Sequence, residues 1–257
     1  MSHGLAVARS ILASTLAGWR GSLAYRPARR QPEQWLRLYE FEACPYCRLV
    51  REVLTELDLD ALILPCPPGG RRFRPEAEHL GGRAQFPFLV DPNTGTQLYE
   101  SAEIIDYLAR TYEGRLLRPV RGWRRATALS GSMLASLSAA LPRPRGGHVR
   151  PSRAPAQPLE LYSFESSPYS RLVREVLCEL ELPYRLRSFG KSTPQEIGPP
   201  AVRRKWFPEA PIKTRNRQAL MAATGRLQVP YLVDPNTGTA LFESAAIMGY
   251  LEQTYAA

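Results

Sequence analysis

The sequence predicts an α/β protein built from two tandem copies of one βαβαββα unit, and two observations lead to that expectation. The first is an internal duplication. Residues 38–62 and 161–185 are identical at 16 of 25 positions, and residues 87–112 and 230–255 at 18 of 26. The second is the alternation of short apolar runs with helical apolar stripes inside each copy. Each copy is too long to be a solenoid repeat, so each is expected to form a domain.

The elements of the first copy follow from its local residue patterns. Apolar runs bounded by turn residues indicate strands, and apolar positions three or four residues apart indicate helices. The stretch DPNTG at 91–95 consists of residues that tolerate tight turns, so it predicts a hairpin. The expected elements are a strand over 36–41, a helix through 49–57, a strand over 62–64, a helix within 75–84, hairpin strands over 86–90 and 96–99, and a helix capped by Ser101.

The second copy repeats this order and sets the expected domain boundaries. We expect a basic N-terminal arm with a short helix at 1–35 and a first domain at 36–113. A basic Pro/Arg-rich linker with a helix follows at 114–158, and a second domain at 159–257. The two matching blocks are offset by 123 and 143 residues, so the second domain carries about 20 extra residues within 190–226.

Length and composition exclude several classes of protein. A chain of 257 residues with 44% hydrophobic and 23% charged residues can bury a core, which excludes bulk disorder. No stretch approaches the roughly 18 consecutive apolar residues of a transmembrane helix, so we expect no integral membrane segment. The net charge of +10 comes from 31 Arg against 3 Lys, and much of it lies in residues 1–32 and 114–159, which contain no acidic residue. No nucleic-acid module matches, so we expect no nucleic-acid partner, and the basic arms are a candidate contact for an anionic surface or a protein.

Residues 1–30 allow two interpretations, an organellar transit peptide or a structural helix. They are rich in Arg and free of acidic residues, as a transit peptide would be. However, SILAS at 10–14 is echoed by SMLAS at 132–136, and a cleaved address has no reason to recur in mid-chain. The echo favours a short helix packed beside each domain.

The first strand–helix junction holds the sequence CPYC at 44–47. Unpaired N–H groups and the positive end of the dipole at the start of a helix lower the pKa of a thiol. We therefore expect Cys44 to be a reactive thiolate that solvent can reach, with Arg48 and Arg51 adding positive potential. Cys47 lies one turn later, where it can resolve a mixed disulfide.

The same spacing occurs in half of a zinc site, and it also occurs by chance among buried cysteines. No second Cys-x-x-Cys pair exists, and the three histidines are scattered along the chain. The sequence therefore favours redox chemistry, and we expect no metal.

With these residues in view, the first copy resembles the thioredoxin-fold, glutathione-binding domain shared by glutaredoxins and the N-terminal half of glutathione S-transferases. Three motifs carry the resemblance: CPYC at 44–47, Gln85-Phe86-Pro87 before the hairpin, and Glu100-Ser101 within ESAEIIDYL. In that family the proline is cis and its backbone neighbours pair with the cysteine of glutathione, while the Glu-Ser pair holds the γ-glutamyl end. A carboxylate can bind the ammonium, and a Ser hydroxyl at a helix N-terminus can bind the carboxylate. The alternative for the Glu-Ser pair is a plain helix cap.

The second copy keeps the binding motifs but has lost the sulfur. It reads SPYS at 167–170, and a hydroxyl cannot replace a thiolate in disulfide exchange. Gln228-Val229-Pro230 and Glu243-Ser244 are retained. The second domain is therefore either a degenerate unit kept for packing or a glutathione site in which Ser167 donates a hydrogen bond to the glutathione thiolate.

The resemblance, which covers roughly 36–113 and 159–257, implies a glutathione-dependent thiol–disulfide oxidoreductase of glutaredoxin type that acts through the first domain. Glutathione would be the co-substrate, and disulfides or glutathionylated proteins the partners. The expected site residues are Cys44 and Cys47 for catalysis, Tyr46, Phe86, Pro87, Glu100 and Ser101 for glutathione, and Ser167, Val229, Pro230, Glu243 and Ser244 as a candidate second set.

Two other functions remain open from the sequence. One is a glutathione transferase, against which the missing all-helical C-terminal domain argues. The other is a non-catalytic glutathione-binding scaffold. An active dithiol suits a reducing compartment, cytoplasmic or alternatively the stroma of a plastid or other organelle.

Overall fold

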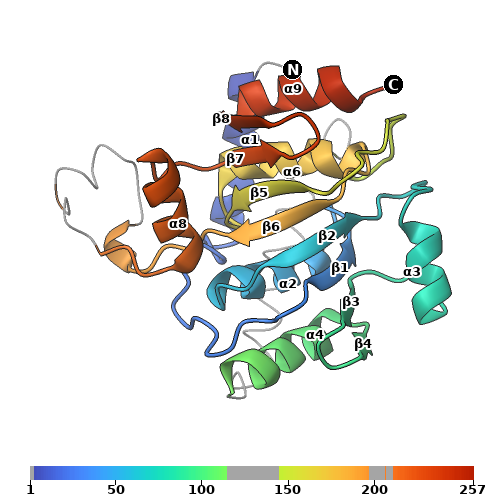
Figure 1. Cartoon of the computed structure of the whole chain (residues 1–257), viewed down its shortest axis with the longest axis horizontal. Helices are drawn as coiled ribbons and strands as arrows, with labels where there is room; N and C mark the ends of the chain where they lie inside the picture. The colour runs from blue at the N-terminus through green and yellow to red at the C-terminus, as the bar shows by residue number, and fades with distance from the viewer. Residues whose placement is uncertain (1–2, 115–144, 197–205, 207–210) are drawn as a thin grey trace.

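The structure is a computed structural model of the whole chain, and it describes residues 3–114, 145–196, 206 and 211–257 (Figure 1). The helix expected in the linker, with the echo at 132–136, lies outside the described residues. Within the described part of the chain, no helix is both long and apolar enough to cross a membrane.

The first unit has the predicted βαβαββα order, preceded by the expected helix of the arm, α1 (His3–Leu16). Its elements are β1 (Leu36–Glu40), α2 (Pro45–Glu56), β2 (Ala61–Pro65), α3 (Arg74–Gly81), β3 (Phe88–Asp91), β4 (Thr96–Leu98), α4 (Ser101–Leu108) and a closing π-helical turn, η1 (Ala109–Glu113). The helix α2 forms where the apolar stripe through 49–57 predicts a helix. Its apolar face packs into the core, and Pro45 occupies the first helical position.

The second unit repeats the order with one change, a longer connection before its second α-helix, α8. Its elements are β5 (Leu159–Ser163), α6 (Pro168–Glu179), β6 (Tyr184–Ser188), a 3₁₀ turn η2 (Pro194–Glu196), α8 (Arg215–Thr224), β7 (Tyr231–Asp234), β8 (Thr239–Phe242) and α9 (Ser244–Tyr255). The extra residues predicted within 190–226 therefore lie between β6 and α8, and α8 itself is the counterpart of α3.

The two units share one continuous sheet, which the sequence did not predict. The strand order is β4-β3-β1-β2-β6-β5-β7-β8, with β2 and β6 antiparallel at the centre. Their register pairs Leu62 with Arg185, and Ala61 and Ile63 pair with Leu186 and Tyr184. Because residues 61–63 correspond to 184–186 in the repeat, this register places a pseudo-twofold axis through the centre of the sheet.

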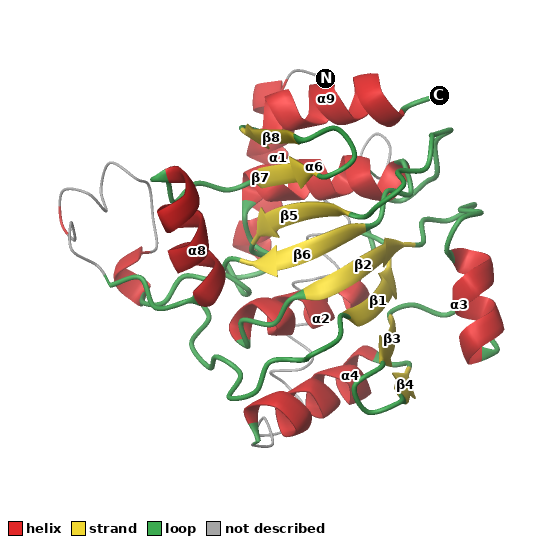
Figure 2. Cartoon of the chain, in the orientation of Figure 1, coloured by secondary structure: helices red, strands yellow, loops and turns green. Residues whose placement is uncertain are grey.

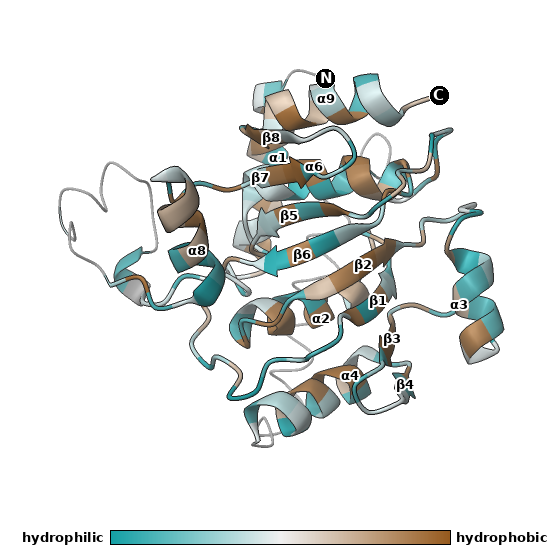
Figure 3. Cartoon of the chain, viewed as in Figure 1, coloured by the Kyte–Doolittle hydropathy of each residue, from teal (hydrophilic) through white to brown (hydrophobic). Residues whose placement is uncertain are grey.

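Helices α2, α4, α6 and α9 contribute to one apolar core that runs through both units. Figures 1 and 2 show α2 and α6 behind the central strands, with α3 and α8 at opposite ends of the molecule. Strand β2 is hydrophobic along most of its length, whereas β6 carries hydrophilic residues at both ends (Figure 3). A smaller cluster, Tyr39, Leu64, Cys66, Ala77 and Phe88, packs α3 against the sheet.

Candidate functional site

The two cysteines lie at the junction of β1 and α2, as predicted. Cys44 is the N-cap of α2 in an extended conformation, and its Sγ accepts a hydrogen bond from the backbone N–H of Cys47 at 3.2 Å. An N-cap acceptor satisfies one of the N–H groups that have no partner within the helix. The thiol of Cys44 therefore occupies the position that favours negative charge.

The environments of the two thiols shift their pKa values in opposite directions. Hydrogen bonding from the thiol of Cys47, and from backbone N–H groups at the helix start, lowers the pKa of Cys44 against the opposing effect of burial. Burial and the hydrogen bond to Cys44 hold the pKa of Cys47 well above its usual range. Two titratable groups with diverging pKa values are typical of a nucleophile and a proton-bearing partner.

Cys44 is less accessible than we expected from the sequence. The residue is 4% exposed and Cys47 is fully buried, while Tyr46 between them is exposed. The loop before Cys44 lies against the second half of the chain, where the Glu42 N–H donates to Cys178 Sγ at 3.4 Å and the Ala43 N–H to the Gly146 carbonyl at 3.3 Å. Attack by the Cys44 sulfur therefore requires the groups around it to open.

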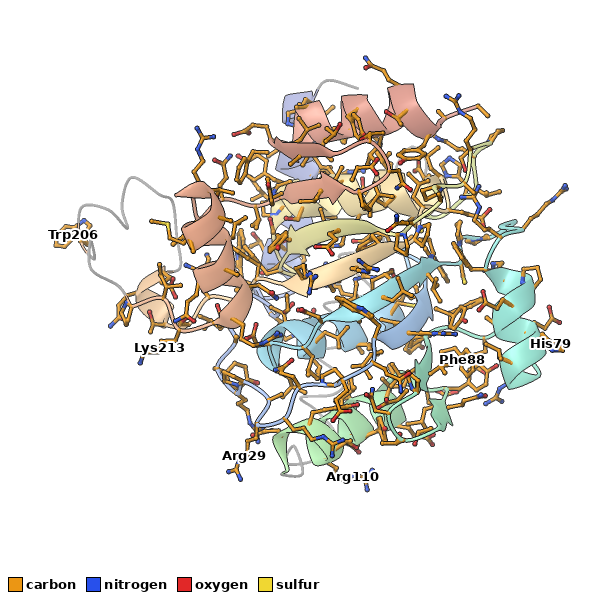
Figure 4. All side chains as sticks on the ribbon, viewed as in Figure 1. Arg29, His79, Phe88, Arg110, Trp206 and Lys213 are labelled. Carbon is orange, nitrogen blue, oxygen red and sulfur yellow. The ribbon has the colours of Figure 1, made fainter. Side chains whose placement is uncertain are left out.

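The expectation that Arg48 and Arg51 add net positive potential at Cys44 is wrong. The peripheral cations Arg29, Arg110 and Lys213 project outward in Figure 4. Arg48 and Arg51, by contrast, are buried and paired with carboxylates. A buried guanidinium needs such partners because its desolvation is costly.

The partners of Arg51 come from both units and form a cluster on the pseudo-twofold axis. Arg51 contacts Glu165 of the second unit at 2.8 Å, and its counterpart Arg174 contacts Glu42 of the first unit at 3.0 Å. Each guanidinium also touches the other carboxylate, Arg51 to Glu42 at 3.2 Å and Arg174 to Glu165 at 3.1 Å. Burial opposes the ionisation of Glu165, but Arg174, Arg51 and Arg48 outweigh it and lower its pKa to about 2.

One member of the cluster breaks the symmetry. Glu40, at the end of β1, pairs with Arg51, whereas the equivalent residue in the second unit is Ser163, which accepts from Arg174 at 3.0 Å. Burial raises the pKa of Glu40 to about 7 despite the attraction of Arg51. The carboxylate thus accompanies the cysteines in the first unit and is lost with them in the second.

Sequence reasoning missed this cluster. A signal was present in the sequence, because both copies carry the same charged residues inside otherwise apolar segments. Glu42 corresponds to Glu165, and Arg51 to Arg174. A single copy gives no reason to bury them.

The proline motif stands beside the cysteines. The Phe86-Pro87 peptide bond is cis, as the resemblance implied. Strand β3 begins directly afterwards, and its Phe88 pairs with Tyr39 of β1. The ring of Phe86 lies edge-on to Phe41, 6.4 Å between centroids, so the proline loop borders the segment that leads to Cys44.

The Glu-Ser pair opens α4 at the same end of the sheet, with a correction to the expected cap. The N-cap is Glu100 and not Ser101, and no side-chain hydrogen bond caps the helix. Glu100 has a φ of 62°, a left-handed conformation that is strained for this residue. Its carboxylate is exposed and accepts from the Gln85 side chain at 2.5 Å. The carboxylate, the hydroxyl and the first N–H groups of α4 suit a ligand carrying both an ammonium and a carboxylate, as glutathione does.

The second unit has the same arrangement around SPYS. We call its residues Ser167, Val229, Pro230, Glu243 and Ser244 the second cradle. Ser167 is the N-cap of α6 and accepts from the N–H of Ser170 at 3.2 Å. The Val229-Pro230 bond is cis, and Glu243 has a φ of 70° before Ser244. Gln228 also donates to Glu243. The backbone features that the resemblance ties to binding thus occur in both units, and the sulfur in one.

The remaining cysteines lie apart from the site and are buried in packing. Cys66 follows β2, and Cys178 contacts the Glu42 N–H and the Gly146 carbonyl from within α6. No group of three or more His, Cys, Asp or Glu among the described residues is arranged to hold a metal ion.

Comparisons with known proteins place the chain in a family. A solved structure of the Bombyx mori glutathione transferase BmGSTD1 is similar, with 28% identity and a TM-score of 0.28, over 34% of this chain and 39% of that chain. Leishmania TDR1, described as a unique trimeric glutathione transferase, shares 15% identity with a TM-score of 0.26, over 87% of this chain and 67% of that chain. No curated protein matches the chain. The family model described as the N-terminal domain of glutathione S-transferase matches residues 38–116 and 161–257. These two segments make up more than half of the sequence, and the chain therefore belongs to the glutathione S-transferase N-terminal-domain family, as a tandem pair of thioredoxin-like domains.

Proposed function

We propose that the first unit is a glutathione-dependent thiol–disulfide oxidoreductase. The observation that supports this most directly is the pair of thiols with opposite pKa shifts at the start of α2. The cis proline loop and the Glu100-Ser101 pair at the same end of the sheet are the residues we assign to glutathione. In this assignment Phe86, Pro87 and Tyr46 border the cysteinyl part, and Glu100 with Ser101 holds the γ-glutamyl end.

The proposed reaction begins with attack by the Cys44 thiolate on the glutathione sulfur of a mixed disulfide R–S–S–G. The S–S bond breaks, R–S⁻ leaves and takes up a proton, and Cys44 is left joined to glutathione. A second glutathione thiolate then attacks the glutathione sulfur, which releases glutathione disulfide and restores the Cys44 thiolate. In the dithiol route Cys47 loses its proton and attacks Cys44, forming the Cys44–Cys47 disulfide and releasing glutathione as thiolate.

The test is reduction of a glutathionylated peptide by the full-length protein. We expect Cys44→Ser to abolish turnover and Cys47→Ser to retain the monothiol route. The matched control is Cys66→Ser, which changes a buried thiol outside the site and should leave turnover near that of the wild type. Full activity in Cys44→Ser would contradict the proposal.

Access to Cys44 is tested separately by the pH dependence of its alkylation with iodoacetamide. If Cys44 has a lowered pKa and becomes accessible during the experiment, its alkylation rate should rise with pH and reach half its maximum below the ordinary cysteine pKa of about 8.5. A rate no faster than that of an ordinary thiol at neutral pH would refute the redox role.

A conjugation assay with an electrophilic aryl substrate separates this function from glutathione transfer, because transfer forms a thioether and leaves no disulfide. Glutathione binding without either activity would indicate the non-catalytic scaffold. We further propose that the protein works in a reducing compartment, cytoplasmic or stromal, since an oxidising one would hold the dithiol as a disulfide.

A further inference from the structure

The N-terminal helix belongs to the first unit in sequence but packs on the second unit in space. Figure 1 shows α1 beside α6 and α9, and α1 packs directly against α6. The side chains that face the second unit are small and buried: Ala6, Ser10, Ala13 and Ser14. The large apolar side chains of α1, such as Leu5 and Leu12, point the other way and are exposed. We expected a short helix beside each domain; α1 packs on the second unit, although the first unit follows it in the sequence.

The contacts of this arm reach the SPYS end of the second cradle. Ser14 donates its hydroxyl to the Ser166 carbonyl at 2.9 Å, and the Ser166 N–H donates to the Gly21 carbonyl at 3.4 Å. The hydroxyls of Ser22 and Ser166 also share a hydrogen bond. Ser166 directly precedes Ser167, the residue that replaces the nucleophilic cysteine. The arm therefore holds the loop that would contact the sulfur of glutathione.

The arm also reaches the Glu-Ser end of the same cradle. His3 Nε2 lies 3.4 Å from the hydroxyl of Ser244, the residue we assign to the ligand carboxylate. Ser244 is 2% exposed, whereas its counterpart in the first unit, Ser101, is half-buried. The arm thus contacts Ser166, directly before Ser167, and the hydroxyl of Ser244, while Glu243 beside Ser244 stays exposed.

Two further contacts fix the path of the arm. Arg9 lies 3.6 Å from Glu175 of α6, midway along the helix. Gly21, with a φ of 71°, passes so close to the axis that a Cβ there would be 2.8 Å from Glu165 Cβ and 3.1 Å from Glu52 Cα. The arm is seated between the units at this point and is not a loose extension.

We propose that the second cradle is a docking site for the chain's own N-terminal helix, which excludes glutathione from it. This rests on the proposed function only for the assignment of the cradle residues. The duplicated site has exchanged a tripeptide ligand for a covalently attached helix, so the protein binds glutathione through its first unit alone. Covering this site costs the protein no thiol–disulfide activity, because Ser167 has a hydroxyl where the first unit has the Cys44 thiol.

The test is calorimetric titration of the reduced, full-length protein with reduced glutathione, comparing two variants of α1. Ala13→Arg places a charged side chain on the docked face, where Ala13 is 1% exposed, and should displace the helix. The matched control Leu12→Arg makes the same charge change on the outer face, where Leu12 is 53% exposed. We expect Ala13→Arg to bind one more equivalent of glutathione than the wild type, and Leu12→Arg to match the wild type. Adding Ser244→Ala to Ala13→Arg should remove the extra equivalent.

The increment tests this inference independently of the first unit. If the first unit does not bind glutathione, the proposed function is refuted, but Ala13→Arg should still bind one equivalent of glutathione more than the wild type. Two equivalents in the wild type, or a gain of none once α1 is displaced, would overturn the inference. If Ala13→Arg does not fold, hydrogen exchange of the wild type decides. Slow exchange of the α1 amides that stays slow when glutathione is added supports the inference. Fast exchange without glutathione, or exchange that becomes faster when glutathione binds, refutes it.

Discussion

Replacing Arg51 by Met should destabilise the whole protein, because this guanidinium connects the two units at their shared axis. Arg51 is 1% exposed and contacts Glu40, Glu42 and Glu165, the last at 2.8 Å. Removing one partner of a buried ion pair costs about 3–5 kcal/mol, since the remaining charge is left without compensation. A surface pair contributes about 0–1 kcal/mol, so the two cases are easily separated.

The structure places the cost near the lower end of that range. Arg174 still holds Glu42 and Glu165, at 3.0 and 3.1 Å, after Arg51 is removed. The group left without its cation is Glu40, whose pKa burial already raises to about 7, so it can take up a proton. We therefore expect a loss of about 3 kcal/mol in the free energy of unfolding near neutral pH.

The assay is equilibrium unfolding in urea with the m-value held as a check on the unfolded state. The control is Arg185→Met, whose side chain is 33% exposed and pairs with Glu160 at 3.3 Å; Glu160 is itself part-exposed and keeps Arg187 at 3.0 Å. This variant should lose less than about 1 kcal/mol. An Arg51→Met variant within 1 kcal/mol of the wild type would show that the cluster does not hold the units together.

Three further predictions concern Glu40 and the arm. Glu40→Ser, which copies the residue of the second unit, should lower the pKa of Cys44 further, because the Glu40 charge raises it against the hydrogen bond from Cys47; an unchanged pH profile of Cys44 alkylation would contradict this. Folded Glu40 keeps its proton up to a pKa of about 7 and the unfolded chain loses it near 4.5, so stability should fall by about 2–4 kcal/mol as the pH rises between these values and then level off. Urea titrations at pH 5 and 8 measure this fall. Burial also raises the pKa of Glu56 to about 7 and that of Asp58 to about 6, so Glu40→Ser should make the fall smaller without removing it, and an equal fall in Glu40→Ser would refute the assignment. Gly21→Ala should lower the urea midpoint more than Gly18→Ala. Both glycines have positive φ, which costs a residue with a Cβ about 1–2 kcal/mol of stability. Only at Gly21 would the added Cβ also meet close backbone and side-chain atoms. Equal midpoints would show that the arm is not seated as described.

The elements and the cradle were predictable because their causes are local. The helical stripe of α2 and the hairpin at 91–95 follow from residue periodicity and turn chemistry, which act over a few positions. The position of Cys44 at a helix start followed from a short local motif, whereas the cis bond before Pro87 was implied by the family resemblance. The cap at Ser101 was placed one residue late, because the positive φ of Glu100 cannot be read from residue periodicity.

The sequence by itself determined two copies of one unit, the order of strands and helices in each, and the loss of sulfur from the second. Only the tertiary structure decided how the copies meet. It joined β2 to β6 in one sheet, buried Arg51 and Arg174 against carboxylates of the opposite unit, and packed α1 against α6 with His3 beside Ser244. Pairing of strand edges, compensation of buried charge and docking of a distant helix join groups more than 100 residues apart. Residue periodicity carries no information about which of those groups will be neighbours, so these contacts had to be seen in the folded chain.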